Sequence, residues 1–372
     1  MIRQRGFTLL EVILAFALLS VGLGILIAIL SGGLAQVRTS GDATEATLHA
    51  QSLLEQVGVL EPIEAGRERG DFDRGRYRWE LVISDNGSTD STRAYLSTLQ
   101  DPRIRVHLQQ GNLGIFGNMN FLMPQAQASI AKVLCADDKL LPGALTKVAE
   151  FMEERPWCAV SRCWRVGDKQ ASLPGEPGEV EGKLPVSLSP KAALLAYFTF
   201  GNPVGNLSQA TCRPEMVIKC GGFNQSLPYS GDREAWARIS AVYGLELQNE
   251  ELIFERVHPL QNRILLDRKN ENLPQMNKLI SIWGAMIDGP DLALLRRHWT
   301  IHFLAQRVPR LVRQILTGKP ALASGVLKEL PLDITPIAVI AAYPIMKFKL
   351  PPAQNTTRKL LKRILEVNGK KL

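Results

Sequence analysis

The most constraining feature of the 372-residue chain is an apolar run near its start, from Phe7 to Leu30, in which Glu11 is the single charged residue. A helix needs about 20 residues at about 1.5 Å each to cross the hydrocarbon core of a bilayer, so this run is long enough to span one. Arg3 and Arg5 precede the run and are expected to keep the N-terminus on the cytoplasmic side. The chain is therefore expected to carry a single N-terminal transmembrane helix.

Glu11 lies inside this span, where a carboxylate is costly and needs a partner or a purpose. The pattern around it, RGFTLLEVILAFALLS, resembles the prepilin-type N-terminus of type IV pilins and type II secretion pseudopilins. The resemblance implies cleavage after Gly6 by a prepilin peptidase, methylation of Phe7, and pairing of Glu11 with the N-terminus of a neighbouring pseudopilin subunit. A plain signal anchor with an acid near the interface is the alternative.

The pilin-like character continues to about residue 80. Ala, Leu and Val recur at helical spacing between residues 40 and 57, as in a stalk helix, and Gly58 can end that helix. Tyr77 and Trp79 then alternate on one face of a short strand. No further pilin-like strands follow, so we predict a first domain over residues 1–80.

A different pattern begins at Leu81. LVIS is a short apolar, β-branched run, and the DNGSTDST that follows is rich in turn and helix-capping residues, which predicts strand, turn and helix start. Ligands of open α/β sheets bind beyond the carboxyl ends of such strands, so Asp85 is expected to face a ligand crevice. A tight turn followed by a helix capped by Ser88 or Asp90 is the plain alternative.

The segment AKVLCADDKLLPGAL, residues 131–145, repeats the order of strand, polar turn and helix. Asp137 and Asp138 are adjacent at its strand end, where like charges repel unless a cation or protons relieve them. A hard divalent metal that bridges to a diphosphate would provide this relief.

Five segments in order resemble family 2 glycosyltransferases. The resemblance spans about residues 81–265 and implies an α/β fold of the GT-A type, a Rossmann-like mixed sheet flanked by helices. It implies inverting transfer of a sugar from a UDP- or GDP-type nucleotide-sugar donor to a hydroxyl of a glycan or lipid-linked acceptor, with Mg²⁺ or Mn²⁺, in surface polysaccharide or glycan synthesis. The segments are VISDNGSTDST, NLGIFGNMN, CADDKLLPGAL, GNPVGNLSQATCRPEMV and GGFNQSLPYSGDREAWARISAVYG.

The resemblance also implies roles for individual residues. Asp85 would contact the nucleotide base, Asp137 the donor sugar or ribose, and Asp138 the metal. Asp232 falls where the family places its general base, and Cys135 stands where the family has the first acid of its metal motif. The other residues implied to bind the nucleotide sugar are Asn86, Ser88, Asn112 and Gly114.

Two of these assignments have alternatives. Asp232 could instead cap the helix that begins at REAWARIS, although Ser230 could cap it equally well. His258, in ERVHPLQNR, could approach the metal or the diphosphate, but a lone histidine beside a proline also fits a structural role.

The C-terminal part, residues 266–372, is predicted to be helical and basic. FLAQRVPRLVRQIL and RKLLKRIL place leucine and isoleucine at helical intervals between Arg and Lys, and residues 347–372 contain eight Lys and Arg against one acid, Glu366. Such helices either lie on an anionic membrane surface or pack on the catalytic core with a solvated basic face. The net charge of +8 fits an anionic partner, and nucleic acid is not expected to be that partner.

The two halves of the sequence conflict with each other. Family 2 enzymes begin with a strand, a loop and a helix that are absent before Leu81, and the loss of this interior strand predicts unpaired neighbours and reduced donor affinity. An N-terminus held in the cytoplasm also places the remainder across the membrane from cytoplasmic nucleotide sugars. We therefore expect a protein of the bacterial inner membrane, with the side of the catalytic domain left open. A filament subunit and a nonfunctional fusion are the alternatives to an enzyme.

Overall fold

A computed structural model describes residues 70–72, 76–167, 184–256, 272–287, 289–305, 308–316, 330, 334–348 and 350–369. The chain divides into two compact units, the first made of Met1–Pro62 and Ser88–Thr98, the second of Ile63–Gly87 and Leu99–Leu372. In the described part of the first unit, Thr92–Leu96 forms a short helix, α2. The N–H of its first residue, Thr92, donates to the Asp90 carboxylate at 2.9 Å. All other elements named below belong to the second unit.

A six-stranded mixed sheet forms the centre of the second unit. Its strands follow the order β5-β9-β7-β10-β6, with β8 paired to β10 as well. The β7 and β10 strands are parallel, whereas β9 is antiparallel to both β5 and β7. The mixed α/β sheet predicted from the sequence is confirmed. The strands are β5 (Ala131–Lys132), β6 (Lys139–Leu140), β7 (Val160–Gly167), β8 (Ser187–Leu188), β9 (Ala210–Cys212) and β10 (Leu245–Glu255).

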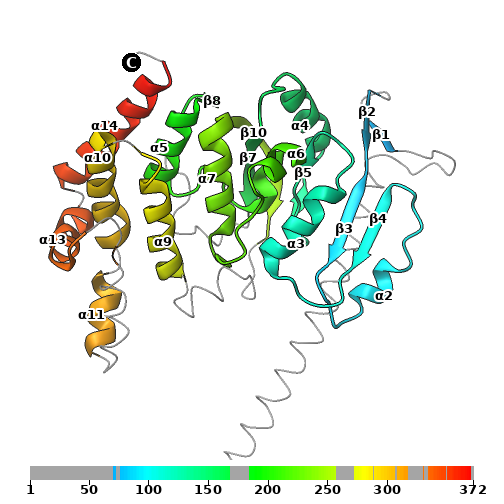
Figure 1. Cartoon of the computed structure of the whole chain (residues 1–372), viewed down its shortest axis with the longest axis horizontal. Helices are drawn as coiled ribbons and strands as arrows, with labels where there is room; N and C mark the ends of the chain where they lie inside the picture. Colours follow the sequence, from blue (N-terminus) through cyan, green and yellow to red (C-terminus); the bar gives the residue numbers. More distant parts are fainter. Residues whose placement is uncertain are drawn as a thin grey trace, which may run out of the picture. The chain divides into compact units, whose positions relative to one another are not determined.

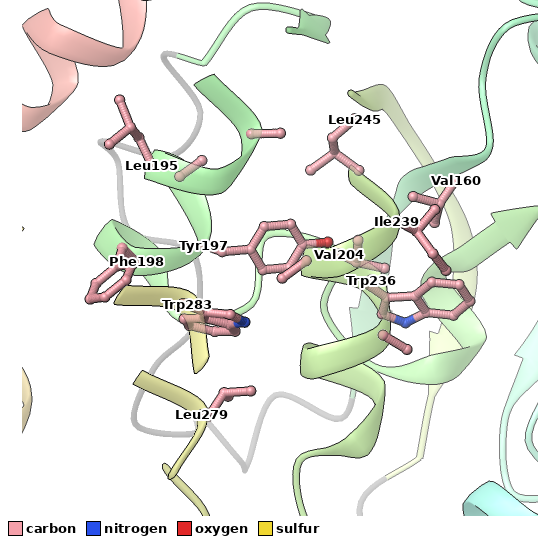
Figure 2. Close-up of a cluster of buried hydrophobic side chains, with 14 of the residues drawn as sticks. Val160, Leu195, Tyr197, Phe198, Val204, Trp236, Ile239, Leu245, Leu279 and Trp283 are labelled. Atoms are coloured by element: carbon pink, nitrogen blue, oxygen red, sulfur yellow. The ribbon is translucent and has the colours of Figure 1, made fainter. Parts of the chain in front are cut away.

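The main core lies between this sheet and the helices that cover it (Figure 1). Tyr197, Trp236 and Trp283 are fully buried there, and the ring centroids of Tyr197 and Trp283 lie 5.8 Å apart (Figure 2). Large aromatic side chains contribute much of the apolar area that a core removes from water. These residues come from α5 (Pro190–Phe200), α7 (Gly231–Tyr243) and α9 (Asn272–Gly284).

The C-terminal helices share this core. Trp299, Leu360 and Ile364 are buried in the same cluster as Trp236, and Arg363 of α14 donates to the Asp291 carboxylate of α10 at 2.8 Å. The apolar face of α14 thus packs on the protein, as one of the two sequence alternatives predicts. The elements are α10 (Gly289–Trp299), η4 (Thr300–Leu304), α11 (Val308–Leu316), α13 (Pro336–Lys347) and α14 (Pro351–Val367).

A separate two-stranded ribbon stands beside the main sheet. Its strands, β3 (Leu81–Asp85) and β4 (Ile104–Leu108), are parallel and in register from Leu81 opposite Ile104 to Asp85 opposite Leu108. Among the described residues, no strand pairs with both β3 and β5. The second edge of β3 and the second edge of β5 therefore make no ladder bonds to another strand in the described part of the chain. An interior strand, whose absence the sequence predicts, would supply such ladder bonds.

Side chains attach the ribbon to α3 (Gly114–Leu122) in place of those ladder bonds. The Ser84 hydroxyl donates to the Asn118 side-chain oxygen at 2.6 Å, and the Asn118 amide donates back to the Ser84 carbonyl at 3.4 Å. The rings of His107 and Phe121 meet edge to face at 5.2 Å. The ribbon is therefore held by a few polar and aromatic contacts rather than by a continuous sheet.

The segment before β3 is joined to the same fold. A short hairpin of β1 (Gly70–Phe72) and β2 (Tyr77–Trp79) leads directly into β3. Arg76 and Tyr77 both donate to the Glu153 carboxylate, each at 2.7 Å, at the end of α4 (Ala144–Glu153). The Arg103 guanidinium lies 4.4 Å from the centre of the Trp79 ring.

No helix within the described ranges has the length and hydropathy needed to cross a membrane. The predicted N-terminal span, with Gly6, Phe7 and Glu11, lies outside the described residues.

Candidate active site

An acidic turn lies in the segment that joins β5 to β6, the strands at the two ends of the strand order of the main sheet. The Asp138 N–H donates to the Cys135 carbonyl at 3.1 Å and closes the turn. The turn brings together the Cys135 thiol and the carboxylates of Asp137 and Asp138, with possible ligand atoms that all lie within 4.8 Å of one another. A set of two carboxylates and one thiol at this spacing can hold a cation.

Burial makes the charged form of Asp138 unfavourable. Its side chain is 3% exposed, and burial together with the neighbouring charge of Asp137 raises its pKa from 3.8 to about 6. A hydrogen bond from Ser208 and the Arg256 N–H, which donates to Asp138 Oδ1 at 3.2 Å, act in the opposite direction. A bound divalent cation would remove this penalty, because it would offset the paired negative charges.

The thiol of Cys135 is neutral in this setting. Burial is the main cause that raises its pKa to about 12, and the charges of Asp138, Asp137 and Asp232 raise it further. Asp232 comes from α7, far along the chain, and its charge nevertheless acts on this thiol. The general base implied by the resemblance thus lies within electrostatic reach of the acidic turn.

Two further residues, the buried Ser208 and the partly buried Lys132, support the acidic turn. Ser208, which is fully buried, accepts the Cys135 N–H at 2.8 Å through its hydroxyl. The Lys132 ammonium donates to the Ser208 and Ala210 carbonyls at 2.7 and 3.2 Å, and burial lowers the pKa of this lysine. These hydrogen bonds connect β5 and the acidic turn to β9 and to the residues just before it.

The short 3₁₀ helix η3 (Leu207–Gln209) positions Ser208. A capping box closes it, because the Gln209 N–H donates to the Asn206 side chain at 3.0 Å and the Asn206 N–H donates to the Gln209 side chain at 3.1 Å. The Gln209 amide also donates to the Cys163 carbonyl of β7 at 3.0 Å. The sequence signal for this support is the NLSQ pattern just before a strand.

Asp232 lies in the first turn of α7. Ser230 occupies the N-cap position but makes no side-chain capping bond, whereas backbone N–H groups of Asp232 and Arg233 act on the Asp232 carboxylate. Burial raises the pKa of Asp232 despite these groups, with Arg233 and Asn202 opposing the rise. A carboxylate with a raised pKa at a helix start is suited to accept a proton.

Asn202 orients this carboxylate. Its amide nitrogen donates to Asp232 Oδ2 at 3.4 Å and to the Gly205 carbonyl at 2.5 Å. Its side-chain oxygen is buried and has no hydrogen-bond partner among the described residues. Gly231, which precedes Asp232, admits no side chain, since a Cβ there would lie 2.6 Å from the Phe116 ring of α3. The Asp232 carboxylate is thus held by both a neighbouring amide and close helix packing.

The predicted nucleotide-binding residues form a second cluster, at the end of β3. The Asn86 amide donates to the Asn112 side chain at 3.1 Å and to the Gly114 carbonyl at 3.3 Å, and the Leu113 N–H donates back to Asn86 at 2.8 Å. Gly87 has φ +87°, and a Cβ there would lie 3.0 Å from the Asn112 nitrogen. Glycine is therefore required at residue 87, where the turn after β3 approaches the backbone of Asn112.

Asp85 is 5% exposed at the end of β3, and its carbonyl accepts the Gln109 N–H at 3.0 Å. Ser88 belongs to the first compact unit. His258 lies outside the described residues. The structure therefore gathers Asp137, Asp138 and Asp232 in one neighbourhood and Asn86, Asn112 and Gly114 in another, and the roles implied for all of them stay predictions.

Comparisons with known proteins match two parts of the chain to known families. Residues 59–185 match the family model described as Glycosyl transferase family 2, and residues 1–27 match the one described as Prokaryotic N-terminal methylation motif. Both resemblances found in the sequence are thereby confirmed. The first match begins well before Leu81 and ends within the described sheet region, so the boundaries of 1–80, 81–265 and 266–372 stay predictions.

Individual relatives cover each half separately. Type II secretion system protein I of Xanthomonas campestris is 49% identical over 80 residues, which make up 22% of this chain and 58% of that protein. TuaG of Bacillus subtilis, provisionally named a teichuronic acid biosynthesis glycosyltransferase, is 37% identical over 92 residues, 24% of this chain and 36% of that protein. The chain thus spans less than two thirds of the length of these relatives.

A solved structure shares the fold. The structure of residues 1–349 of TarS from S. aureus, in complex with UDP, superposes with a TM-score of 0.50 at 14% identity, covering 77% of this chain and 82% of that one. The same part of TarS in complex with UDP-GlcNAc gives the same TM-score at 12% identity, covering 78% and 83%. At this identity the likeness supports the α/β architecture alone.

Proposed function

We propose that this chain, which carries a family 2 glycosyltransferase domain behind a prepilin-type N-terminus, is a glycosyltransferase that moves a sugar from a nucleoside-diphosphate donor to an acceptor hydroxyl. The observation that carries the proposal is the acidic turn of Cys135, Asp137 and Asp138, whose possible ligand atoms lie within 4.8 Å of one another and which lies within electrostatic reach of Asp232. The carboxylates of the acidic turn suit the cation that accompanies a diphosphate, and the Asp232 carboxylate suits the proton of an acceptor hydroxyl.

The acidic turn fits a divalent cation. Asp138 would hold Mg²⁺ or Mn²⁺, with His258 as a further candidate ligand, and Asp137 would reach the donor sugar or ribose. The ion would neutralise charge on the departing diphosphate. The raised pKa of Asp138 supports this fit, because a buried carboxyl beside a second one is stabilised in its charged form by a cation. Cys135 contributes a neutral thiol beside the two carboxylates.

Asp232 acts as the general base in this proposal. It accepts the proton of the acceptor hydroxyl while that oxygen forms a bond to the anomeric carbon of the donor sugar. The bond from the anomeric carbon to the diphosphate breaks, and its electron pair leaves with the nucleoside diphosphate. A single displacement of this kind inverts the anomeric configuration. Asn202 keeps the carboxylate in place through its bond to Oδ2.

The cluster at the end of β3 is assigned to the donor nucleotide. Asp85 and Asn86 would contact the base, with Asn112 and Gly114 lining the pocket beside them. TarS was solved with UDP and UDP-GlcNAc, which supports a nucleotide-sugar donor for the shared fold. The acceptor is assigned to the class of glycans or lipid-linked glycans of a bacterial surface.

A donor panel tests the proposal. The full chain is incubated with UDP- and GDP-sugars and Mn²⁺, and released nucleoside diphosphate is measured. Asp232→Asn is expected to lower turnover by about 10²–10⁴-fold, because the acceptor proton loses its base, while donor binding by calorimetry stays unchanged.

Asp291→Asn is the matched control. Asp291, like Asp232, is an aspartate in the first turn of a helix, but it is buried and pairs with Arg363 in the C-terminal region. Its loss is expected to lower the melting temperature and to leave turnover of the folded protein intact. Equal turnover by the Asp232→Asn and unaltered chains would contradict the assigned base.

A second function, that of a filament subunit, is favoured by the N-terminal match to the methylation motif and by the 49% identity to a type II secretion system protein. In this candidate a prepilin peptidase cleaves after Gly6, Phe7 is methylated, and Glu11 pairs with a neighbouring pseudopilin subunit at the inner membrane. Mass spectrometry of the mature N-terminus detects the cleavage and the methyl group. Processing and filament entry without activity on any donor would favour this function over the enzyme.

A nonfunctional fusion is the remaining alternative, because each half matches only part of its relatives. Sequencing the source DNA across the codons for residues 76–90 tests whether the join is genuine. Full-length protein detected in the native cells, with both activity and N-terminal processing, would exclude this alternative.

A further inference from the structure

The helix α13 presents an apolar face outwards. Ile337, Ile340 and Phe348 are 79%, 55% and 67% exposed, and with Pro344 they recur at the three- and four-residue spacing of one helix face. Val339 and Ala342 of the same helix are buried. The exposed side chains are thus a second apolar face, distinct from the face that packs on the protein.

The inner face of α13 already has its partners. Ala342 is buried in a cluster with Ile301 and Ala305, and Tyr343 and Met346 pack against that cluster. The outer face is therefore not the ordinary core side of an amphipathic helix, which would normally leave polar residues outside.

The neighbouring helix α11 repeats this arrangement. Val308 and Leu311 are buried, whereas Val312, Ile315 and Leu316 are 47%, 53% and 81% exposed. The α11 and α13 helices contact each other, and Figure 1 shows them at the same end of the second unit. We call Val312, Ile315, Leu316, Ile337, Ile340 and Phe348 the outer apolar patch.

Basic side chains accompany the patch. Arg313 is exposed on α11, and the Lys347 ammonium lies 5.8 Å from the centre of the Phe348 ring. The adjacent α14 exposes Arg358, Lys359 and Lys362. Residues 308–369 contain ten Lys and Arg against three acids, Glu329, Asp333 and Glu366. An apolar patch in such a basic region complements a surface with an apolar interior and anionic headgroups.

We propose that the outer apolar patch binds an anionic lipid bilayer, with α11 and α13 lying in the plane of the headgroups. The twelve residues of α13 extend about 18 Å, short of the roughly 30 Å hydrocarbon core, so the helix lies on the surface rather than crossing it. Exposed isoleucine, leucine and phenylalanine enter the acyl boundary, and Lys347 and Arg313 reach the phosphates. This binding does not depend on glycosyl transfer and can fail or hold independently of it.

Cysteine protection tests the proposal on the full chain. Ile337→Cys and Phe348→Cys are each reacted with iodoacetamide alone, with phosphatidylcholine nanodiscs, and with nanodiscs that contain about one third phosphatidylglycerol, a content that gives an anionic surface. Peptide mass spectrometry follows each labelling rate, and native Cys220 serves as an internal reference. Any binding through the apolar N-terminal run is common to both kinds of nanodisc, so the neutral nanodisc sets the baseline.

We expect the anionic nanodiscs to slow labelling at both positions by about tenfold relative to neutral ones, and about 0.5 M salt to reverse the effect. Val242→Cys, at an exposed apolar position on α7, is the matched control and should label at the same rate throughout. The double variant Arg313→Glu with Lys347→Glu should lose the protection and keep its near-ultraviolet circular dichroism.

Three results would overturn the proposal. The first is unchanged labelling at residues 337 and 348 on anionic nanodiscs. The second is equal protection on neutral nanodiscs, which would exclude the charge complementarity. The third is protection without any lipid that grows with protein concentration, which would assign the patch to a second copy of the chain.

Discussion

The ribbon of β3 and β4 and the six-stranded sheet differ in how their strands are held. In the sheet, β7, β9 and β10 have neighbours on both sides, and the helices above them bury Trp236, Tyr197 and Trp283 completely. In the ribbon, the residues of β3 before Asp85 are only partly buried, and side chains such as Ser84 and Asn118 provide the attachment. The ribbon, which carries the residues assigned to the nucleotide, therefore has fewer strand pairings and less buried side chains than the main sheet.

This difference bears on the prediction that an interior strand is missing. The acidic turn is attached to the main sheet, where Lys132 and Ser208 bind it to β5 and β9, whereas Asp232 lies on α7 and Asn202 in the loop after α5. The donor cluster of Asn86 and Asn112 stands on the ribbon. Loss of an interior strand is therefore expected to weaken donor binding more than it disturbs the residues assigned to chemistry.

Paired truncations should give the largest contrast. Trp236→Ala removes a fully buried side chain and is expected to cost about 3–5 kcal/mol of unfolding free energy, whereas Ile83→Ala in the partly buried β3 should cost about 1–2 kcal/mol. Urea unfolding in mild detergent, followed by circular dichroism, measures both. Equal costs would show that the ribbon is as tightly packed as the sheet and would break the comparison.

The pH dependence of stability tests the acidic turn of the sheet half. Because the pKa of Asp138 is raised from 3.8 to about 6, the folded state binds more protons than the unfolded state between these values. Stability is fully present below the lower pKa and is lost as pH rises through about 6, by about 3 kcal/mol. Mn²⁺ should restore the melting temperature above this pH.

Asp138→Asn should remove both the loss and the response to Mn²⁺. Thermal melting between about pH 4 and pH 8, with and without Mn²⁺, measures both effects. A full Mn²⁺ response in Asp138→Asn would contradict the assignment of this residue as the main ligand.

Asn202→Ala sharpens the comparison on the catalytic side. The Asp232 carboxylate loses the bond to Oδ2 that fixes its orientation, so turnover is expected to fall about 10–100-fold with little change in the KM for donor. Initial rates at varied donor concentration separate the two parameters. Asn202→Asp, which cannot donate in its ionised form, should be at least as impaired, and normal turnover in both variants would rule out the positioning role.

Asn86→Ala is expected to give the smallest effect. It removes the bonds to Asn112 and Gly114 and should raise the KM for donor a few-fold, the equivalent of about 1 kcal/mol, with turnover unchanged. A loss of turnover instead would show that Asn86 affects the chemical step. It would contradict the assignment of donor binding to the ribbon and of the chemical step to residues outside it.

Local pattern was sufficient to predict much of the fold. The strand at Leu81–Asp85, the turn after it and the acidic turn before α4 all follow from apolar runs bounded by turn residues. These are features that depend on neighbours along the chain. The absence of an interior strand before Leu81 stays a prediction.

The supports of the candidate site could not be predicted in this way. Ser208 and Lys132 are ordinary residues in the sequence, and they gain importance when β9 pairs with β5. Asn202 reaches Asp232 across 30 positions of the chain. The exposed apolar face of α13 was equally hidden, since ITPIAVIAAYPIM contains enough apolar residues for two faces and does not say which is covered.

The contacts of Arg76 and Tyr77 with Glu153 bear on where this protein can be cut. The motifs in the sequence predict a border at Leu81, but hydrogen bonds join the hairpin before that residue to α4, and the family match begins earlier still, at residue 59. A shortened protein that starts at Leu81 would leave Glu153 without both of these donors and would remove the hairpin that leads into β3. One that starts ahead of Gly70 would keep them.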